Sequence, residues 1–356
     1  EKNIYDYKFD CEYFLVGFFD YKNFLNILRN VKDDYYLKLL EINFYYELKP
    51  LLTFNIEKKY NEIHRFNIKY SSFCDDNFIS SFNPSICTIN KKLYVSIRNT
   101  NYKLEIINER LCYTVCYDGK FYNISNEHPL LNMTSLYEID ENENINFIGN
   151  KNFRLPNYNK YCIQGVEDIR LINFNDKLYY LGNTLETETH KNTMVLISDD
   201  EQYYLLKYNT HLTQKNWSPF IYNNELYFIY SFSPLIILKF DKENENNVVE
   251  YCYIENDCYF LKNIKGGSQG VLYNGEYIFI GHGTINKNGR TYYHVLLKLN
   301  CDDGVFNISF NDIFFIEKKG IEYISGLTRF KNKFLCSYGT DDNKPNFIEL
   351  DNLIKF

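Results

Sequence analysis

The sequence has few of the features that mark a membrane protein, a nucleic-acid-binding protein or a metalloprotein. Its 356 residues contain no apolar run long enough for a membrane span, which takes about 18 residues, so no membrane span is expected. The net charge is −7 and no basic stripe stands out, so we expect no nucleic-acid partner. Acidic residues and histidines do not cluster at ligand spacing, so we expect neither a metal nor a cofactor.

The ten cysteines include no Cys-x-x-Cys pair, which argues against a zinc ribbon or a dithiol redox motif. A chain of this length can bury a large core without disulfide bonds. Scattered thiols are typical of a reducing compartment, so we expect a cytoplasmic location. The chain begins with Glu1 rather than Met, so a trimmed start, including a removed signal segment, stays open.

Proline (7) and methionine (2) are scarce, whereas tyrosine (35) and phenylalanine (29) are abundant. Aromatic and β-branched side chains favour β-sheet. Length alone suggests two domains, but all-β folds of this size can form single units. The composition therefore favours a large all-β fold.

One stretch combines acidic chemistry with a strand signal. Residues 165–170 read Gly-Val-Glu-Asp-Ile-Arg, and an aromatic strand pair with a turn at Asn175-Asp176 follows over residues 171–181. Neighbouring carboxylates raise one another's pKa, and a carboxyl group with a raised pKa can donate a proton. The alternative is a solvated strand end with an internal Asp–Arg ion pair.

The surrounding pattern occurs five times. Each copy is a polar loop, a short strand, a tight turn and an aromatic strand that ends in a polar residue. The turns are Asn90-Lys91-Lys92, Asn175-Asp176, Asn223-Asn224, Asn274-Gly275 and Lys331-Asn332. Asparagine and glycine suit the positive φ of hairpin turns. After a long first interval the copies recur at nearly the period of propeller blades, about 40–50 residues.

The repeat predicts an all-β fold, a five-bladed β-propeller over residues 73–356, with a β-sandwich array as the alternative. Residues 193–197 and 292–297 supply outer strands, and the long first interval holds an insertion around residues 126–159. Residues 1–72 form a mixed N-terminal extension, with a helix in 21–40 and strands in 48–70, packed on the ring.

In a propeller the loops before the inner strands converge on the central axis. The polar side chains expected around one funnel are Asn83, Arg98, Glu167, Asp168, Arg170, Lys215, His282 and Asp342. Trp217 is expected in the core, with stacking on a sugar as the alternative.

One motif per blade carries a resemblance. The motifs are Asn83-Pro84 with Arg98, Gly-x-Glu-Asp-x-Arg at 165–170, Lys215-Asn216 before Pro219, Lys265-Gly266-Gly267 with His282-Gly283, and Gly326-Leu327 with Tyr338-Gly339-x-x-Asp342. In this order they resemble the mannoside phosphorylases, glycoside hydrolase family 130, and the related β-mannosyltransferases on the same propeller. The match covers most of residues 80–345.

The resemblance implies a role for each matched residue. Asp168 is the catalytic acid, which protonates the glycosidic oxygen through a sugar hydroxyl. The implied substrate-binding residues are Asn83, Arg98, Glu167, Arg170 and Asp342, and the implied phosphate-holding residues are Lys215, Lys265 and His282. Glu167 orienting Asp168 or Arg170 is an alternative. Without the resemblance, His282 is interpreted as a structural histidine, Lys215 as a solvated side chain, and Asn83 with Arg98 as loop caps.

The resemblance implies an inverting phosphorylase or glycosyltransferase, whose partners are an oligosaccharide or glycan and either phosphate or a sugar nucleotide. Asn83 stands where propeller glycosidases that use water have Asp, which disfavours hydrolysis because an inverting hydrolase needs a second carboxylate. Ile169 replaces the usual Pro, and residues 231–234 lack the family's His-Arg-Pro, so one cation is missing. A glycoside hydrolase and a non-catalytic glycan-binding propeller stay as alternatives.

Overall fold

The computed structural model describes residues 26, 28–30, 32, 78–107, 110–125, 127–155, 163–185, 191–209, 212–256, 258–285, 291–302, 304–316 and 320–350. Nearly all regular structure in these residues is β-strand, as predicted; the helical residues are 26 and 28–30 and the short helix α4 (Tyr259–Lys262), which lies between blades three and four. No helix in this part of the chain is long and apolar enough to cross a membrane. The predicted domain boundary after residue 72 and the strands predicted in 48–70 lie outside the described residues.

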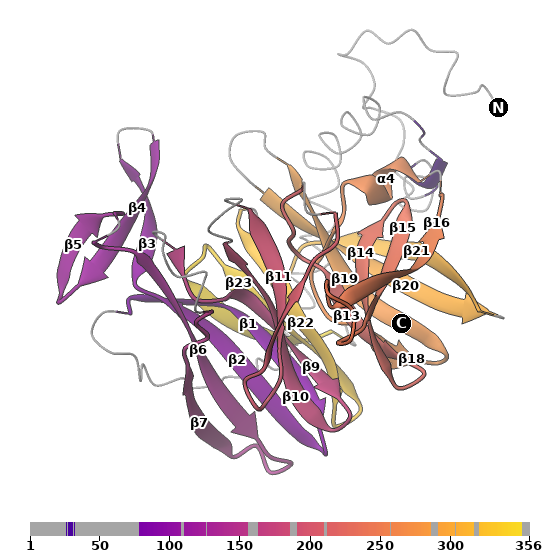
Figure 1. Ribbon diagram of the computed structural model, residues 1–356, viewed down its shortest axis with the longest axis horizontal. Helices are drawn as coiled ribbons and strands as arrows, with labels where there is room; N and C mark the ends of the chain where they lie inside the picture. The colour runs from indigo at the N-terminus through magenta and orange to yellow at the C-terminus, as the bar shows by residue number, and fades with distance from the viewer. Residues whose placement is uncertain are drawn as a thin grey trace, which may run out of the picture.

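The strands form five consecutive antiparallel sheets, the blades (Figure 1). Blade one is β1 (Ser80–Ile89), β2 (Lys92–Thr100), β6 (Leu130–Ile139) and β7 (Ile145–Lys151), with β8 (Ile163–Gln164) parallel to β6. Blade two is β9 (Glu167–Phe174), β10 (Lys177–Leu185), β11 (Asn192–Ile197) and β12 (Tyr203–Leu206). Blade three is β13 (Ser218–Tyr222), β14 (Glu225–Phe232), β15 (Leu235–Phe240) and β16 (Val248–Ile254).

Blade four is β17 (Lys265–Gly266), β18 (Val271–Tyr273), β19 (Glu276–Ile285), β20 (Thr291–Asp302) and β21 (Val305–Phe314). Blade five is β22 (Glu322–Phe330), β23 (Lys333–Thr340) and β24 (Lys344–Glu349). The outer strands predicted at 193–197 and 292–297 are the third strands β11 and β20.

Each blade has the hairpin that the sequence predicted between its two aromatic strands. In all five turns the two central residues have positive φ, from 47° at Asn90 to 84° at Gly275. This backbone twist matches the right-handed twist of the paired strands, which explains the preference for asparagine and glycine. The turns therefore fix the register of all five hairpins.

Five apolar clusters lie between the blades, one at each junction. Because side chains alternate along a strand, each blade buries one set on each side. In blade four, Phe279 packs toward blade three whereas Ile278 and Ile280 pack toward blade five. The junction between blades five and one has its own cluster, and β1 packs against β22 and β23. The predicted ring is confirmed, and Trp217 is core, only 1% exposed between blades two and three.

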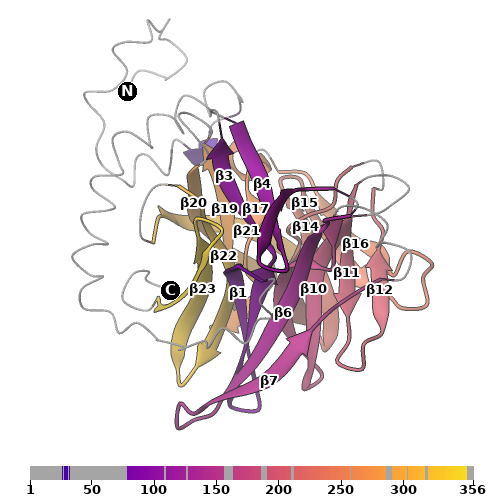
Figure 2. The ribbon, with the colours of Figure 1, turned by 90° about the vertical axis from the view of Figure 1, so that its left-hand side faces the viewer.

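The predicted position of the insertion is wrong. Residues 130–151 form β6 and β7, which are the third and fourth strands of blade one. The extra structure is a separate sheet of β3 (Tyr102–Ile107), β4 (Arg110–Tyr117) and β5 (Lys120–Asn123), which we call the arm. It stands out from the ring between β2 and β6 (Figures 1 and 2). Its aromatic strands resemble blade strands, so composition could not separate them.

Leu28 and Arg29 of the N-terminal extension contact blade four. Residues 26 and 28–30 are helical, within the helix predicted at 21–40. Leu28 is 1% exposed in the cluster between blades three and four. Arg29 Nη2 donates to the Phe310 carbonyl at 2.8 Å, and its guanidinium lies 5.2 Å from that ring.

Candidate functional site

The site begins with polar residues at irregular points of the inner strands. Asn83 (φ 44°) lies at a register shift in β1, and Asp168 (φ 50°) lies at a register shift in β9. Asn216 (φ 61°) lies two residues before β13 begins. Asparagine and aspartate tolerate this left-handed conformation better than most residues. The register shifts at Asn83 and Asp168 interrupt the alternation of their strands and re-aim these polar side chains.

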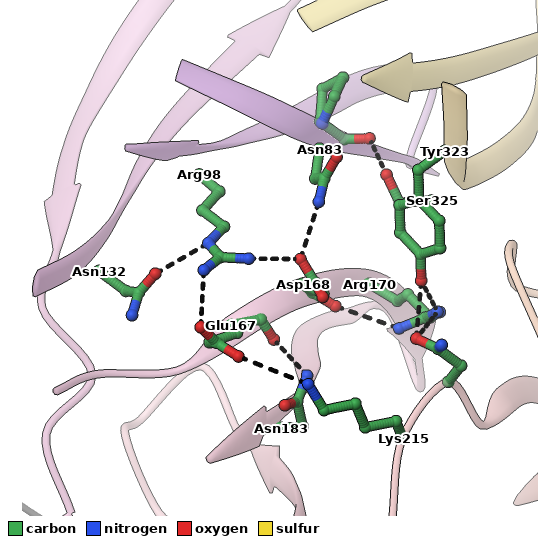
Figure 3. A network of polar contacts seen from close by, with 12 residues as sticks. Asn83, Arg98, Asn132, Glu167, Asp168, Arg170, Asn183, Lys215, Tyr323 and Ser325 are labelled. Carbon is green, nitrogen blue, oxygen red and sulfur yellow. Dashed lines mark hydrogen bonds and ion pairs between the residues drawn. The ribbon is translucent and has the colours of Figure 1, made fainter. Parts of the chain in front are cut away.

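Arg98 on β2 connects the two acids of blade two to blade one. Its Nη1 donates to Asp168 Oδ1 and its Nη2 to Glu167 Oε1, both at 2.7 Å (Figure 3). Nε donates to Asn132 Oδ1 at 2.8 Å, and Nη2 also reaches the Tyr102 hydroxyl at 2.7 Å. Arg98 is 7% exposed. A buried guanidinium is tolerated because its charge is paired and its donors are used.

Asp168 is held as a carboxylate. Burial raises its pKa, but the charge of Arg98, the hydrogen bond from Asn83 and the charges of Lys215 and Arg170 together place the pKa below its ordinary value. The group is therefore ionised at neutral pH. An ionised carboxylate accepts a proton, and it acts as an acid only after receiving one.

Lys215 brings a second cation to the acids. Its Nζ lies 3.9 Å from Glu167 Oε2, and its side chain is 41% exposed. Asn183 Nδ2 donates to the Glu167 backbone carbonyl at 3.3 Å. Glu167 therefore bridges Arg98 and Lys215, which fits the orienting role that the sequence left open.

Arg170 is fully buried and joins the blades. Its Nε and Nη2 donate to the carbonyls of residues 266–267 at 2.7 and 3.2 Å, and its Nη1 donates to the Asp168 carbonyl at 3.1 Å. Nη2 also contacts the Tyr323 hydroxyl and Asn216 Oδ1. These contacts support a positioning role behind Asp168. Direct substrate binding by Arg170 stays a prediction.

His282 on β19 lies beside Tyr323 and is 4% exposed. Burial lowers its pKa to about 3, helped by His294, Arg170 and Lys265. The resemblance implied a phosphate-holding cation, but the imidazole is neutral at pH 7. Phosphate binding by His282 stays a prediction, and the contact would be a hydrogen bond rather than an ion pair.

Blade five supports the irregular part of β1 around Asn83. The Pro84 carbonyl accepts hydrogen bonds from Ser325 Oγ (2.7 Å) and Ser337 Oγ (2.6 Å). A Cβ at Gly339 would lie 2.4 Å from Asn83 Oδ1 and 2.8 Å from its backbone nitrogen, so only glycine fits there. The motif Tyr-Gly-x-x-Asp thus has a packing reason for its glycine.

The structure joins Asn83, Arg98, Glu167, Asp168 and Lys215 in one polar network (Figure 3). We call these five residues the Asp168 site.

Two other predicted residues, Lys265 and Asp342, have no hydrogen bond or ion pair to the Asp168 site among the contacts described above. Lys265 is exposed and pairs with His282 across β17 and β19. Asp342 lies in the turn between β23 and β24, and its sugar-binding role stays a prediction.

Sequence reasoning missed three residues that contact the Asp168 site, Tyr102, Asn132 and Asn183, and a fourth, Tyr323, that contacts Arg170 behind it. None belongs to a repeated motif, so no sequence signal singled them out. Three buried atoms around the site, Asn83 Oδ1, Asn183 Oδ1 and His282 Nδ1, have no hydrogen-bond partner among the described residues. Buried polar groups are normally satisfied, so these atoms are available to a polar ligand or water. No group of three or more potential metal ligands occurs in the described ranges.

No protein-family model matches the sequence. No curated protein matches it significantly either.

Solved structures do resemble the fold. Beta-1,2-mannobiose phosphorylase from Listeria innocua, in complex with beta-1,2-mannobiose, has 14% identity and a TM-score of 0.51, covering 85% of this chain and 95% of that chain. A glycosyl hydrolase from Bacteroides ovatus has 10% identity and a TM-score of 0.49, covering 76% and 84%.

A structure reported for the GH130 mannoside phosphorylases, a family containing glycoside hydrolases that target beta-1,2 mannosidic linkages in Candida mannan, has 11% identity and a TM-score of 0.48. It covers 76% of this chain and 84% of that chain. At these identities the likeness concerns the fold, and the Listeria innocua structure agrees with the propeller described above.

Proposed function

We propose that the protein is a carbohydrate-active enzyme that transfers a mannosyl-like unit, with inversion, between a glycan and a phosphate-bearing partner. The observation that carries the proposal is the Asp168 carboxylate held by Arg98 Nη1 at 2.7 Å and Asn83 Nδ2 at 2.9 Å. The two contacts fix one oxygen in place. Such preorganisation is what an acid–base group needs.

The proton balance follows from the ionised state of Asp168. In glycan synthesis the carboxylate takes the proton of the acceptor hydroxyl, relayed through a sugar hydroxyl. The acceptor oxygen bonds to the anomeric carbon while the bond from that carbon to the phosphate oxygen breaks, and the phosphate leaves with the electron pair. In the reverse reaction phosphate attacks, and protonated Asp168 returns the proton to the glycosidic oxygen.

The neighbouring side chains favour transfer over hydrolysis. Inverting hydrolysis needs a base carboxylate about 6.5–9.5 Å from the acid to activate water. Asn83 cannot serve, because its amide donates to Asp168. Glu167 is already engaged by Arg98 and Lys215. An incoming phosphate is itself a nucleophile and needs no such base.

A binding module without turnover is the second candidate. Of the three residues implied to hold phosphate, His282 is neutral at pH 7, which leaves Lys215 and Lys265. Arg170, the other cation near Asp168, is fully buried against backbone carbonyls. A site with so few available cations favours this alternative.

The decisive experiment separates the reactions by product. The protein is incubated with a β-mannoside panel with and without phosphate, and separately with GDP-mannose and oligosaccharide acceptors, followed by mass spectrometry. Sugar 1-phosphate identifies a phosphorylase, and extension from the nucleotide donor identifies a transferase. Free mannose without phosphate dependence identifies a hydrolase and overturns the proposal. Glycan binding without any product identifies the binding module.

A further inference from the structure

The arm is anchored to the ring beside the Asp168 site. It leaves blade one where β2 ends, two residues after Arg98 (Figures 1 and 2). Asn101 Nδ2 donates to the Pro129 carbonyl at 3.1 Å, and the Cys116 backbone nitrogen donates to the Asn101 carbonyl at 2.7 Å. An apolar cluster of Phe82, Tyr102, Val115 and Leu130 packs its base. The base therefore has a defined position relative to the site.

Two tyrosines of the arm, Tyr102 and Tyr113, form a chain of contacts that begins at Arg98. The Tyr102 hydroxyl bonds Arg98 Nη2 at 2.7 Å, and Arg98 holds Asp168. Tyr102 pairs with Val115 across the strands, so Tyr113, two residues from Val115, lies diagonally on the same face. The rings of Tyr102 and Tyr113 meet edge to face with centroids 5.4 Å apart.

Tyr113 differs from the other exposed aromatic residues because its ring contacts Tyr102, which bonds Arg98. It is 42% exposed. Phe121, which is 54% exposed, lies on the opposite face of the arm, with Lys103 Nζ 4.9 Å from its ring. Tyr251 and Tyr253 lie on β16, the last strand of blade three. Among the exposed aromatic side chains of the described residues, only Tyr113 is connected to the Asp168 site through a single ring, that of Tyr102, whose hydroxyl bonds Arg98.

We infer that Tyr113 is a stacking platform for a sugar unit that lies beyond the unit reacting at Asp168, so the substrate is an oligosaccharide chain longer than a disaccharide. The inference rests on the proposed function, because it places the reacting unit at Asp168. A tyrosine ring offers an apolar face with a polar edge, which suits a sugar that has an apolar face and a rim of hydroxyls. An exposed ring on an anchored sheet provides that face with little loss of side-chain entropy.

The test measures affinity against chain length. β-Linked manno-oligosaccharides of two to six units are titrated calorimetrically into wild type, Tyr113→Ala, Tyr113→Phe and Phe121→Ala. Wild-type affinity should rise with length. Tyr113→Ala should weaken binding of the longer chains roughly 3- to 10-fold and leave the disaccharide unchanged. Tyr113→Phe keeps the ring and should bind like wild type, as should Phe121→Ala on the opposite face.

Affinity independent of length, absence of binding at any length, or equal losses in Tyr113→Ala and Phe121→Ala would overturn the inference. Turnover of the same compounds with phosphate is measured in parallel. Length-dependent binding without turnover would contradict the proposed function and leave the platform standing. If the wild type turns over these compounds but Tyr113→Ala binds chains of every length as tightly as wild type does, the proposed function stands and the platform is overturned.

Discussion

Asn83 of blade one donates its side-chain amide to Asp168 Oδ1 of blade two at 2.9 Å. Both residues have positive φ, and each sits at a register shift of the innermost strand of its blade. The hydrogen bond therefore joins two equivalent irregularities of the repeat. It also helps to keep Asp168 ionised, because the amide hydrogen favours the carboxylate over the neutral acid.

Asp168→Asn should abolish turnover and keep the fold. Asparagine tolerates the left-handed φ of 50° at this position and has nearly the same shape. The amide cannot exchange a proton at neutral pH, so kcat should fall by about 10²–10⁴. The measurement is product formation with whichever substrate the mass-spectrometric panel identifies, alongside circular dichroism.

Asp176→Asn is the matched control for this variant. Asp176 lies in the exposed β9–β10 turn with a φ of 57°, so the same chemical change is made at a similar backbone geometry. It should leave kcat unchanged. Full activity in Asp168→Asn would remove Asp168 from the mechanism.

Arg98→Met should make stability depend on pH in a specific direction. Wild-type Asp168 has a lowered pKa, so its contribution is complete above its unfolded pKa of about 3.9 and is lost as pH falls through the lowered folded value. Without Arg98 the two half-buried carboxylates lose their main partner, so the pKa of Asp168 should rise. The variant should lose about 3–5 kcal/mol of unfolding free energy at pH 7.

The loss should shrink at pH 5, because protonation of Asp168 then offsets part of the lost pairing. Urea denaturation at pH 5 and pH 7 measures the loss of unfolding free energy. Arg154→Met, at an exposed arginine on the segment after β7, is the control and should cost little at either pH. An equal loss at pH 5 and pH 7 in Arg98→Met would contradict the assigned role of the ion pairs.

The sequence was informative about the ring because the blade repeat is local. Hairpin turns such as Asn175-Asp176 depend on two residues of suitable chemistry and an alternating strand on each side. Placing the extra sheet at residues 126–159 failed, because the arm has the same aromatic strand composition as a blade. Nothing local distinguishes β3 from β6 until the pairing partners are known.

The sequence predicted the neighbours of a site residue only where those neighbours also belong to a repeated motif. Arg98, Glu167 and Asp168 were grouped correctly by their places in successive blades. The burial of Arg170 and the neutral state of His282 could not be foreseen, since both depend on what covers a side chain from other blades. Residue type tells which charge a side chain carries in water, and burial decides whether that charge survives in the folded protein.

Tyr323→Phe should loosen the junction behind Asp168. The Tyr323 hydroxyl receives a hydrogen bond from Arg170 and donates to Asn216 Oδ1 at 2.8 Å. Its loss removes one of the three acceptors around Arg170 Nη2 and the donor to Asn216 Oδ1, which should cost about 0.5–1.5 kcal/mol of unfolding free energy. Tyr251→Phe, at a side chain 47% exposed on β16, is the control and should be neutral within about 0.5 kcal/mol in urea denaturation. Equal stability of the two variants would show that the contact contributes nothing.

His282 should make the protein less stable in mild acid. Its pKa is about 3 in the folded state, against an ordinary value of 6.5. Below pH 6.5 the unfolded chain therefore binds a proton that the folded protein excludes, so stability falls as pH decreases from 6.5 toward 3. The slope from this group is on the order of 1 kcal/mol per pH unit.

His282→Gln removes the titrating group and should flatten the decline measured by urea denaturation between pH 7 and pH 5. His128→Gln, at a half-buried histidine stacked on Tyr122, is the control for the same chemical change elsewhere in the protein. If His282→Gln kept the wild-type slope, the imidazole would bind protons alike in the folded and unfolded states and would carry a charge in mild acid. Phosphate binding by His282 as a cation would then become the better interpretation, because a charged ring beside Lys265 would need an anion to offset it.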